Sequence, residues 1–359
     1  MPGRKKTRRI MLGDLPVGGD SPVSVQSMTS TPTRDVEATL RQIAELERVG
    51  CEVIRVAVPD VESAMALPRL VASTGLPLVA DLHFVWELAM LVLDQGVAGI
   101  RINPGTIPGK TRLGEIAREA AARGVAVRIG VNSGSLEPAA RGKGRPAEAS
   151  ALARSALDAA ELFAASGVEN IKISVKASDV PRTLGAYRLV SAECDWPLHV
   201  GVTEAGTLFS GTIKSAVGIG ALLAEGIGDT IRVSLTASPV EEVRVGKKIL
   251  SSLGLREFGP EVISCPTCAR TEIDVESLAN EVEKALEHLK APITVAVMGC
   301  AVNGPGEARE ADIGIAGGGS YGLLFVRGEM VKKVEPGAIL EELLAAVHDL
   351  AGGSGGEVG

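Results

Sequence analysis

Aromatic side chains, long apolar runs and net positive charge are all lacking in this chain of 359 residues. Aromatic residues make up only 3% of the sequence, whereas hydrophobic residues make up 45%, so the core has to be aliphatic. No apolar run is long enough to span a bilayer, and we therefore expect no membrane partner. The net charge of −7 argues against non-specific binding to nucleic acid, so we expect no nucleic-acid partner either.

Signals for export are also missing from the sequence. Residues 1–9 are basic, but no apolar segment follows them, so they do not form a secretory signal and we expect a solvated basic tail. The cysteine count of five is odd and includes a Cys-x-x-Cys pair, which fits a reducing compartment and metal binding better than disulfides. We therefore predict a cytoplasmic protein.

Three cysteines do stand together, in two short segments near the end of the chain. The first segment is Cys265-Pro-Thr-Cys268, and the second is Cys300-Ala-Val-Asn-Gly-Pro-Gly-Glu307, in which Gly-Pro-Gly predicts a turn. Two cysteines two residues apart can bind one centre from a single turn, and folding has to bring the third back to them. Thiolates are soft ligands, so the arrangement suits either zinc or an iron–sulfur cluster.

A fourth cysteine ligand is missing from this part of the chain. Cys51 and Cys194 lie far upstream and are most simply interpreted as small buried hydrophobic residues. Glu307, seven residues after Cys300, is the nearest candidate for the remaining position. A hard carboxylate on a soft metal centre would be an exchangeable ligand, which suits catalysis better than simple electron transfer.

Apolar, β-branched runs alternate with helical patterns through the first 255 residues, and glycines such as Gly50 and Gly124 end several of the helices. This alternation predicts a (β/α)8 barrel of the TIM type. A doubly wound open sheet is the alternative, but the chain has no Gly-rich nucleotide motif after its first strand. The eight predicted strands cover residues 23–28, 51–58, 78–84, 99–104, 125–132, 170–177, 198–204 and 230–236.

Charged side chains recur near the ends of these strands, where the active sites of barrel enzymes lie. Several Arg or Lys side chains converging on one mouth predict a pocket for a polyanion, because the arginine fork suits phosphate or diphosphate oxygens. The strand-end residues are Arg55, His83, Arg101, Arg128, Asn132, Lys172, Lys176, Glu204 and Arg232.

Two of these side chains allow more than one interpretation. Glu204 could act as a general acid or base, or could form a structural ion pair with a neighbouring cation. His83 could donate to phosphate or be a buried core histidine, and Asp81, on the same face of its strand, would be placed to orient it. His199, at the start of the seventh strand, is predicted to be structural.

The last hundred residues predict a small α+β domain. Strands are expected at 258–263, 293–298, 311–316 and 323–327, with the last two paired. Helices are expected at 275–289, with Asp274 as the N-cap, and at 338–350. The predicted domains are therefore a barrel over 1–255, a cysteine-containing domain over 256–350 and a disordered Gly-rich tail over 351–359.

Several motifs make the chain resemble one known family, 4-hydroxy-3-methylbut-2-en-1-yl diphosphate synthase of the non-mevalonate isoprenoid pathway. The most specific are Cys265-Pro-Thr-Cys268-Ala-Arg-Thr and Met298-Gly-Cys-Ala-Val-Asn-Gly-Pro-Gly-Glu307. Further similarity lies in Arg101-Ile-Asn-Pro-Gly, Arg128-Ile-Gly-Val-Asn132 and Gly201-Val-Thr-Glu-Ala-Gly. The resemblance runs over nearly the whole chain, and the short linker before Cys265 matches the two-domain bacterial form.

This resemblance implies an enzyme that reductively opens and dehydrates 2-C-methyl-D-erythritol 2,4-cyclodiphosphate to (E)-4-hydroxy-3-methylbut-2-enyl diphosphate. It implies that a [4Fe–4S] cluster is bound by Cys265, Cys268, Cys300 and Glu307, and that Glu204 is the catalytic carboxylate. The same resemblance implies substrate binding by Arg55, His83, Arg101, Arg128, Asn132, Lys176 and Arg232.

The resemblance also implies partners. Flavodoxin or ferredoxin would supply two electrons, and a head-to-tail homodimer would bring the cluster domain of one subunit to the barrel mouth of the other. An interpretation from another class remains open at this point: a barrel that binds or isomerises a sugar phosphate, followed by a domain with structural zinc.

Overall fold

The computed structural model describes residues 3–83, 85–107, 109–136 and 144–353. The chain divides into two compact units, Met1–Arg256 and Glu257–Gly359, which are described separately below. Phe84, at the end of the third predicted strand, lies outside the described residues. Among the described residues, no helix is long and apolar enough to cross a membrane.

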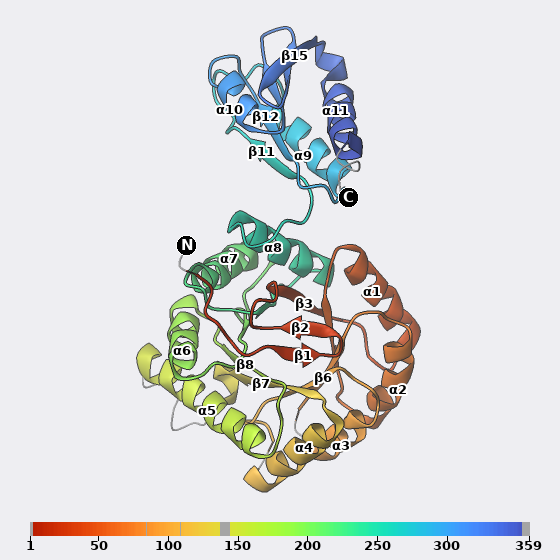
Figure 1. The fold of residues 1–359 in the computed structure, drawn as a ribbon, viewed down its shortest axis with the longest axis vertical. Coiled ribbons are helices and arrows are strands. Elements are labelled where there is room, and N and C mark those ends of the chain that lie inside the picture. Colours follow the sequence, from red (N-terminus) through yellow and green to blue (C-terminus); the bar gives the residue numbers. More distant parts are fainter. Residues whose placement is uncertain (1–2, 84, 108, 137–143, 354–359) are drawn as a thin grey trace. The chain divides into compact units, whose positions relative to one another are not determined.

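The first unit contains the predicted parallel barrel (Figure 1). Its strands pair in the order β8-β7-β6-β5-β4-β3-β10-β9, and every pairing is parallel. A parallel bridge between Ile173 and Leu198 joins the two ends of this order, so the sheet closes. The strands are β3 (Ser24–Met28), β4 (Val53–Ala57), β5 (Leu78–Leu82), β6 (Gly99–Ile102), β7 (Ala126–Asn132), β8 (Ile171–Lys176), β9 (His199–Val200) and β10 (Thr230–Ile231).

A helix follows each strand and packs on the outside of the barrel, as Figure 1 shows. Helix starts follow the sequence: the Asp35, Asp60 and Asp179 side chains accept backbone hydrogen bonds at the first turns of their helices. The (β/α)8 prediction is confirmed, and the open sheet is excluded. The helices are α1 (Val36–Arg48), α2 (Val61–Ala72), α3 (Trp86–Leu93), α4 (Lys110–Arg123), α5 (Arg145–Ala165), α6 (Val180–Glu193), α7 (Leu208–Ala224) and α8 (Pro239–Ser252).

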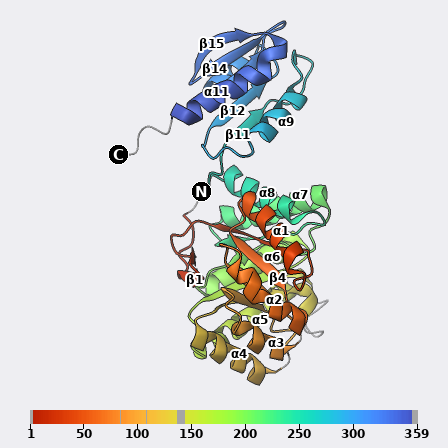
Figure 2. The ribbon, with the colours of Figure 1, turned by 90° about the vertical axis from the view of Figure 1, so that its right-hand side faces the viewer.

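A short antiparallel hairpin that the sequence did not predict precedes the barrel. Its strands, β1 (Ile10–Leu12) and β2 (Leu15–Val17), pack on residues near the starts of the barrel strands, among them Val53, Val79 and Ala126. Figure 2 shows β1 at one end of the barrel, outside the ring of helices. The hairpin covers the amino end, which leaves the carboxyl ends of the strands as the open mouth.

Some of the basic residues before this hairpin are held by barrel groups while Lys6 and Arg9 are exposed, so the prediction of a solvated tail is only partly correct. Arg4 pairs with the buried Asp229. Arg8 pairs with Asp195 at 2.6 Å and lies over the Trp196 ring, with its guanidinium carbon 5.3 Å from the ring centroid. The positive charge of this segment meets acidic groups of the barrel, which composition alone could not indicate.

The second unit is built on a five-stranded mixed sheet in the order β11-β12-β13-β14-β15. The first three strands are parallel, and β14 and β15 continue the sheet antiparallel. The expected pairing of the 311–316 and 323–327 strands is present, whereas β15 was not predicted. The strands are β11 (Glu261–Ser264), β12 (Thr294–Met298), β13 (Ile313–Gly317), β14 (Gly322–Val326) and β15 (Glu329–Val334).

Helices cover both faces of this sheet. Helix α9 (Val275–Leu286), capped by Asp274 as predicted, and α11 (Ile339–Gly353) share one core with Val295 and Val297 of β12. Helix α10 (Gly304–Glu310) packs against the other face, where Ala296 and Met298 lie.

Two predictions for this unit need correction. The Gly-Pro-Gly segment was expected to be a turn, but Pro305 lies in the first turn of α10, where its missing N–H costs little. The tail was expected to start at residue 351, but α11 continues to Gly353, and residues 354–359 lie outside the described part.

Candidate active site

A row of charged side chains crosses four neighbouring barrel strands. Strand register aligns Asp81 with Arg101, Arg101 with Arg128 and Arg128 with Lys172. Residues in register on parallel strands point to the same face of the sheet, and all four side chains are buried. The row therefore lies inside the barrel.

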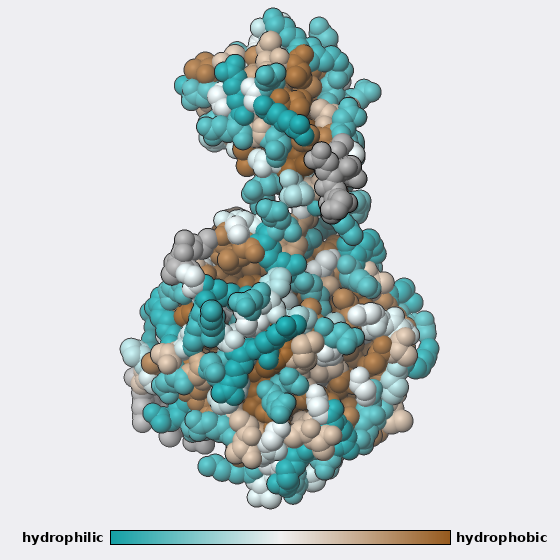
Figure 3. All heavy atoms as spheres, viewed as in Figure 1, coloured by the Kyte–Doolittle hydropathy of each residue, from teal (hydrophilic) through white to brown (hydrophobic). Residues whose placement is uncertain are grey.

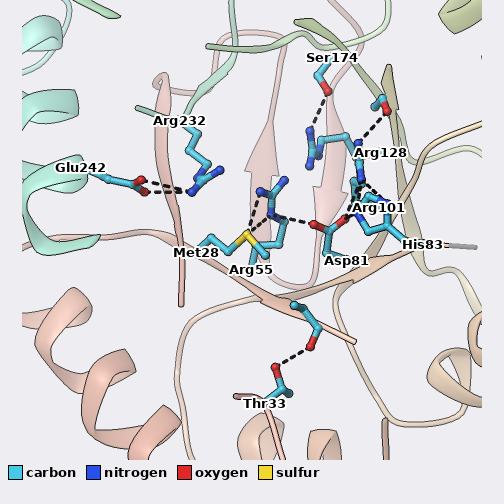
Figure 4. A network of polar contacts seen from close by, with 12 residues as sticks. Met28, Thr33, Arg55, Asp81, His83, Arg101, Arg128, Ser174, Arg232 and Glu242 are labelled. Atoms are coloured by element: carbon cyan, nitrogen blue, oxygen red, sulfur yellow. Dashed lines mark hydrogen bonds and ion pairs between the residues drawn. The ribbon is translucent and has the colours of Figure 1, made fainter. Parts of the chain in front are cut away.

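Asp81 is the central acceptor of this row (Figure 4). Its Oδ1 lies 3.1 Å from Arg101 Nη1 and 3.4 Å from His83 Nε2, and its Oδ2 lies 3.6 Å from Arg55 Nε. Burial alone would raise the pKa of Asp81, but the charges of Arg55 and Arg101 and the hydrogen bond from His83 hold it well below its usual range. The predicted role of Asp81 in orienting His83 agrees with this geometry.

Arg55 has little compensation for its charge. Besides the ion pair with Asp81, its Nε and Nη2 point at the Met28 sulfur, at 3.1 and 2.9 Å. A thioether is a weak acceptor, so these contacts hold the guanidinium in place without neutralising it. Burial lowers the pKa of Arg55 to about 10.

Arg128 is the least satisfied arginine of the row. Its Nη1 donates to Ser174 Oγ at 2.7 Å, while its Nε and Nη2 are buried without a partner among the described residues. Burial, together with the nearby charge of Arg55, lowers the pKa of Arg128 well below its ordinary value. Gly130 leaves room for these side chains, because a Cβ there would lie 2.7 Å from Arg101 Nε.

Arg232 and Lys176 extend the positive region toward the mouth. The Arg232 Nη2 lies 3.3 Å from both carboxylate oxygens of Glu242, which comes from the first turn of α8 (Figure 4). Burial and the charge of Arg128 lower the pKa of Lys176 well below its ordinary value. A Cβ at Gly201 would lie 2.4 Å from the backbone oxygen of Arg232, so glycine is needed there, and it also leaves room for Lys176 Nζ.

Cations outnumber carboxylates in this pocket. Among the described residues, the acidic groups that act on this set of cations are Asp81, Glu242 and, for Lys172, Asp229, which is itself paired with Arg4. The cations are Arg55, Arg101, Arg128, Lys172, Lys176 and Arg232. Uncompensated buried charge is expensive, and proteins tolerate it where a ligand supplies the opposite charge. The pocket is therefore built for an anion with more than one negative charge.

Two further predicted site residues lie at or beyond the carboxyl ends of barrel strands, Asn132 at the end of β7 and Glu204 in a bend after β9. Glu204 is exposed and has a backbone φ of 52°, a left-handed conformation that is strained for a residue with a side chain. Asn132 is in register with Lys176, and its side chain accepts the backbone N–H of Ser135 at the start of a short 3₁₀ turn, Ser133–Ser135. That bond leaves the amide NH₂ of Asn132 as the group available to a ligand.

Sequence reasoning missed Glu242, Met28 and Ser174. Glu242 is buried and accepts from Ser27 Oγ at 3.0 Å and from the Leu235 backbone N–H at 3.1 Å, in addition to Arg232. In sequence it is one of two adjacent glutamates after a helix-starting proline, and no signal separates it from a surface carboxylate. Only the register of α8 against the barrel turns it inward.

In the second unit, Cys265 and Cys300 follow neighbouring parallel strands. Cys265 comes directly after β11, and its backbone N–H donates to Val297 O of β12 at 3.3 Å. Its Sγ accepts the Gly299 N–H at 3.1 Å, which places this sulfur beside the residue that precedes Cys300. Folding thus brings the two cysteine segments together, as the sequence predicts.

The other sulfurs lie where a thiolate is stabilised. The backbone N–H of Arg270 and the side chain of Thr271 lower the pKa of the Cys268 thiol. Backbone N–H groups of Asn303 and Val302 lower the pKa of the Cys300 thiol. The two upstream cysteines differ: Cys51 is buried with its pKa raised to about 12 by burial, and Cys194 is only partly buried.

Glu307 lies in the first turn of α10, close in sequence to Cys300 but on a separate element. No three His, Cys, Asp or Glu side chains of the described residues already lie close enough together to hold a metal ion. The donor set still suits a soft centre, because it joins three thiols, two of them with lowered pKa, to one carboxylate.

The fold and site together define a class of protein: a TIM-type barrel that holds a row of buried cations, followed by a small domain that brings two cysteine-containing segments together. Comparisons with known proteins agree. The model of the GcpE TIM-barrel domain matches residues 7–247, and that of the GcpE protein C-terminal domain matches residues 261–349.

Curated relatives match along almost the whole chain. A 4-hydroxy-3-methylbut-2-en-1-yl diphosphate synthase (flavodoxin) of Geobacter sulfurreducens is 53% identical over 97% of this chain and 98% of its own length. The protein of that name in Salinispora tropica is 52% identical over 99% of this chain and 91% of its own length. The chain belongs to the GcpE family of 4-hydroxy-3-methylbut-2-en-1-yl diphosphate synthases, and the resemblance drawn from the motifs is confirmed.

A solved structure resembles the barrel alone. A dihydropteroate synthase from Coxiella burnetii, in complex with pteroic acid, superposes with a TM-score of 0.50 and 9% identity over 69% of this chain and 99% of its own. At that identity the likeness concerns the fold only.

Proposed function

We propose that this chain converts 2-C-methyl-D-erythritol 2,4-cyclodiphosphate into (E)-4-hydroxy-3-methylbut-2-enyl diphosphate by reduction and loss of water. The observation that carries this proposal is the excess of buried cations over carboxylates at the barrel mouth. A cyclic diphosphate carries a negative charge on each phosphorus, which matches a pocket of several arginine and lysine groups. Family membership supports the same substrate.

The reaction breaks the C–O bond from C2 to the diphosphate, removes the C3 hydroxyl as water and forms a double bond between C2 and C3. Two electrons enter, one proton joins the departing hydroxide to form water, and the oxygen released from C2 keeps the bonding electrons as a charged diphosphate oxygen. The diphosphate remains attached through C4, so the pocket keeps hold of the reacting molecule throughout.

Several pocket residues have roles that follow from their positions. Arg55, Arg101, Arg128, Lys176 and Arg232 bind the diphosphate oxygens and stabilise the charge that develops on the departing one. His83, fixed by Asp81 and Arg101, and the amide of Asn132 donate further hydrogen bonds. Glu204, held at the strand end by its strained backbone, moves a proton to the hydroxyl that leaves.

The cysteine domain fits a [4Fe–4S] cluster, held by Cys265, Cys268, Cys300 and Glu307. Such a cluster supplies electrons singly and a Lewis-acidic iron. The chain's contribution is to favour the thiolate form of Cys268 and Cys300 through backbone N–H groups, which lower the pKa of both thiols, and to offer Glu307 as the exchangeable ligand. Names of the relatives support flavodoxin as the electron donor.

A head-to-tail homodimer completes the proposal, and an apolar stripe on α7 supports a second copy as its occupant. Phe209, Ile213 and Val217 recur every four residues along that helix and are 78%, 50% and 56% exposed. Figure 3 shows a brown area over α7. Contiguous exposed apolar surface of this kind marks interfaces. In such a dimer the cysteine domain of one subunit would serve the mouth of the other.

The composition of the metal centre tests the proposal. Protein purified without oxygen should contain about four irons and four sulfides per chain and show a broad visible band that dithionite bleaches. Zinc without iron, in colourless protein, would remove the redox reaction and leave a sugar-phosphate barrel with a structural zinc domain.

A further inference from the structure

Lys172 is a buried cation that the roles assigned above do not use. It stands on β8 in register with Arg128, two positions before Ser174 and four before Lys176. Because the strands run toward the mouth, Lys172 lies deeper in the barrel than Ser174 and Lys176 of the same strand. Its residue is only 1% exposed.

The amine of Lys172 has no acceptor: Nζ is buried without a hydrogen-bond partner in the described part of the chain. The nearest carboxylate that influences it is Asp229, which is already bound to Arg4, to Thr7 Oγ1 at 2.9 Å and to the Leu198 N–H at 2.7 Å. Asp229 therefore serves the amino end of the barrel rather than Lys172.

The groups that face Lys172 from neighbouring elements are mostly cationic. Arg128 from β7 and Arg55 from β4 repel its charge, and Asp229 before β10 attracts it. His199 from β9 is fully buried, and neither of its ring nitrogens has a partner among the described residues. Burial and these arginines lower the pKa of Lys172 to about 7, and burial and Lys176 keep His199 neutral by lowering its pKa.

Charge in the pocket therefore depends on the ligand. Without an anion, a protonated Lys172 adds to the repulsion among Arg55, Arg128 and Lys176, so the proton is released near neutral pH. A bound dianion on Arg128 reverses the local potential and favours the protonated amine.

We propose that Lys172, a buried amine without a partner beside Arg128, is a further positioning residue of the substrate site and takes up a proton when the cyclic diphosphate binds. This inference rests on the proposed function. The added charge at the floor of the pocket offsets the second negative charge of the ligand, and holds Arg128 toward the mouth by repulsion.

Binding of the substrate allows proton uptake by the protein to be measured without a contribution from the substrate's own ionisation. Each phosphorus of a cyclic diphosphate carries only one ionisable oxygen, a strong acid that is fully ionised at neutral pH. Protons taken up on binding near pH 8 must therefore come to the protein and not to the ligand.

Calorimetric titration of the holoenzyme with the cyclodiphosphate, without reductant so that no turnover occurs, tests the proposal. Binding heats in two non-phosphate buffers of different ionisation enthalpy give the number of protons taken up. We expect proton uptake by the wild type near pH 8, and about one proton less for Lys172→Met. The affinity of the wild type should fall more steeply above about pH 8 than that of the variant.

Lys247→Met is the matched control, because Lys247 donates to Val49 O at 3.1 Å, away from the pocket, and its loss should leave the uptake unchanged. Thermal unfolding checks the fold of each variant, with Lys172→Gln as a second substitution if the methionine variant does not fold. The inference would be overturned if the wild type and the Lys172 variants took up equal numbers of protons on binding. It would also be overturned if the wild type bound the cyclodiphosphate tightly without taking up protons. Absence of any cyclodiphosphate binding by the wild type would instead overturn the proposed function, and this role with it.

Discussion

Asp81 and Arg101 face each other in register across β5 and β6, with Oδ1 and Nη1 3.1 Å apart, and this pair anchors the cation row inside the barrel. The carboxylate also holds Arg55 and His83. One acidic residue thus positions three groups that are proposed to meet the substrate. The pocket keeps its positive charge because the arginines further along the row have no such partner.

Replacing Asp81 by Asn should destabilise the protein by about 3 kcal/mol or more, because it leaves Arg55 and Arg101 buried without their counter-charge. Denaturant unfolding of wild type and variant at pH 7 measures the difference. The control is Asp94→Asn, since Asp94 pairs with Arg123 at 2.8 Å on the surface and should matter little. Equal unfolding curves for wild type and Asp81→Asn would contradict the proposed anchoring.

The stability that Asp81 contributes should be lost only as the pH falls into the acid range. The pKa of Asp81 is lowered in the folded state, so its contribution is fully present above the unfolded value of about 4 and is lost only as the pH falls through the lower folded value. The difference between wild type and Asp81→Asn should therefore stay constant from pH 7 to about pH 5 and shrink in stronger acid. Loss of the difference already near pH 6 would assign the effect to another group.

Substitutions of Glu204 should change the activity and the stability of the protein independently of each other. Glu204→Gln should lower the rate strongly while leaving iron content and substrate affinity unchanged, because only a proton-transfer group is lost. Glu204→Gly should also lose activity but gain about 1 kcal/mol of stability, since glycine relieves the left-handed backbone. Bleached visible absorption in Glu204→Gln would make its role structural.

Glu242→Gln should weaken substrate binding through Arg232. The neutral amide cannot hold the Arg232 guanidinium or the Leu235 N–H as the carboxylate does. We expect KM to rise at least several-fold with a smaller change in kcat, measured in steady-state assays. Glu241→Gln, the exposed-side neighbour that pairs with Arg244, is the control. A change confined to kcat would point to direct participation in the chemistry.

Glu307→Ala tests the exchangeable ligand. The three cysteines remain, so the variant should keep the cluster in anaerobic protein and bind the cyclodiphosphate normally, yet lose most turnover. Glu310→Ala, at the other end of the same helix, should behave like the wild type. Full turnover in Glu307→Ala would remove this residue from the ligand set.

Phe209→Asp should disrupt the proposed homodimer, because a charge replaces the most exposed member of the α7 stripe. Sedimentation velocity should show a monomer, and activity per chain should fall with dilution. Met65→Asp is the control, an apolar residue on α2 that is 59% exposed. A monodisperse, fully active monomer of the wild type would contradict the dimer itself.

Sequence pattern predicted those features of the fold that repeat or that have distinctive chemistry. Eight β-branched runs, each followed by a helix, gave the barrel, and the strand-end arginines marked the pocket. The pairing of Asp81 with Arg101 depends on strand register, and the inward direction of Glu242 depends on how α8 packs. Neither register nor packing direction is encoded in a local pattern.

The predictions from sequence mainly missed short elements, both in the second unit and at the start of the chain. Helix α10 begins with Gly-Pro-Gly, which locally favours a turn, and becomes helical because Ala308 packs against the sheet. Strand β15 is almost wholly exposed, so it lacks the apolar alternation that reveals a strand. The basic segment before β1 shows no pattern at all, because its partners Asp195 and Asp229 are distant in sequence.

Turnover of the cyclodiphosphate by the cluster-loaded protein tests the central claim most directly. The protein would be assayed without oxygen with reduced flavodoxin, and phosphorus NMR would follow the cyclic diphosphate. The account predicts conversion to a linear diphosphate identified as (E)-4-hydroxy-3-methylbut-2-enyl diphosphate, with two electrons consumed per product. Protein that holds its full iron and sulfide, binds the cyclodiphosphate and yet forms no linear product would contradict it.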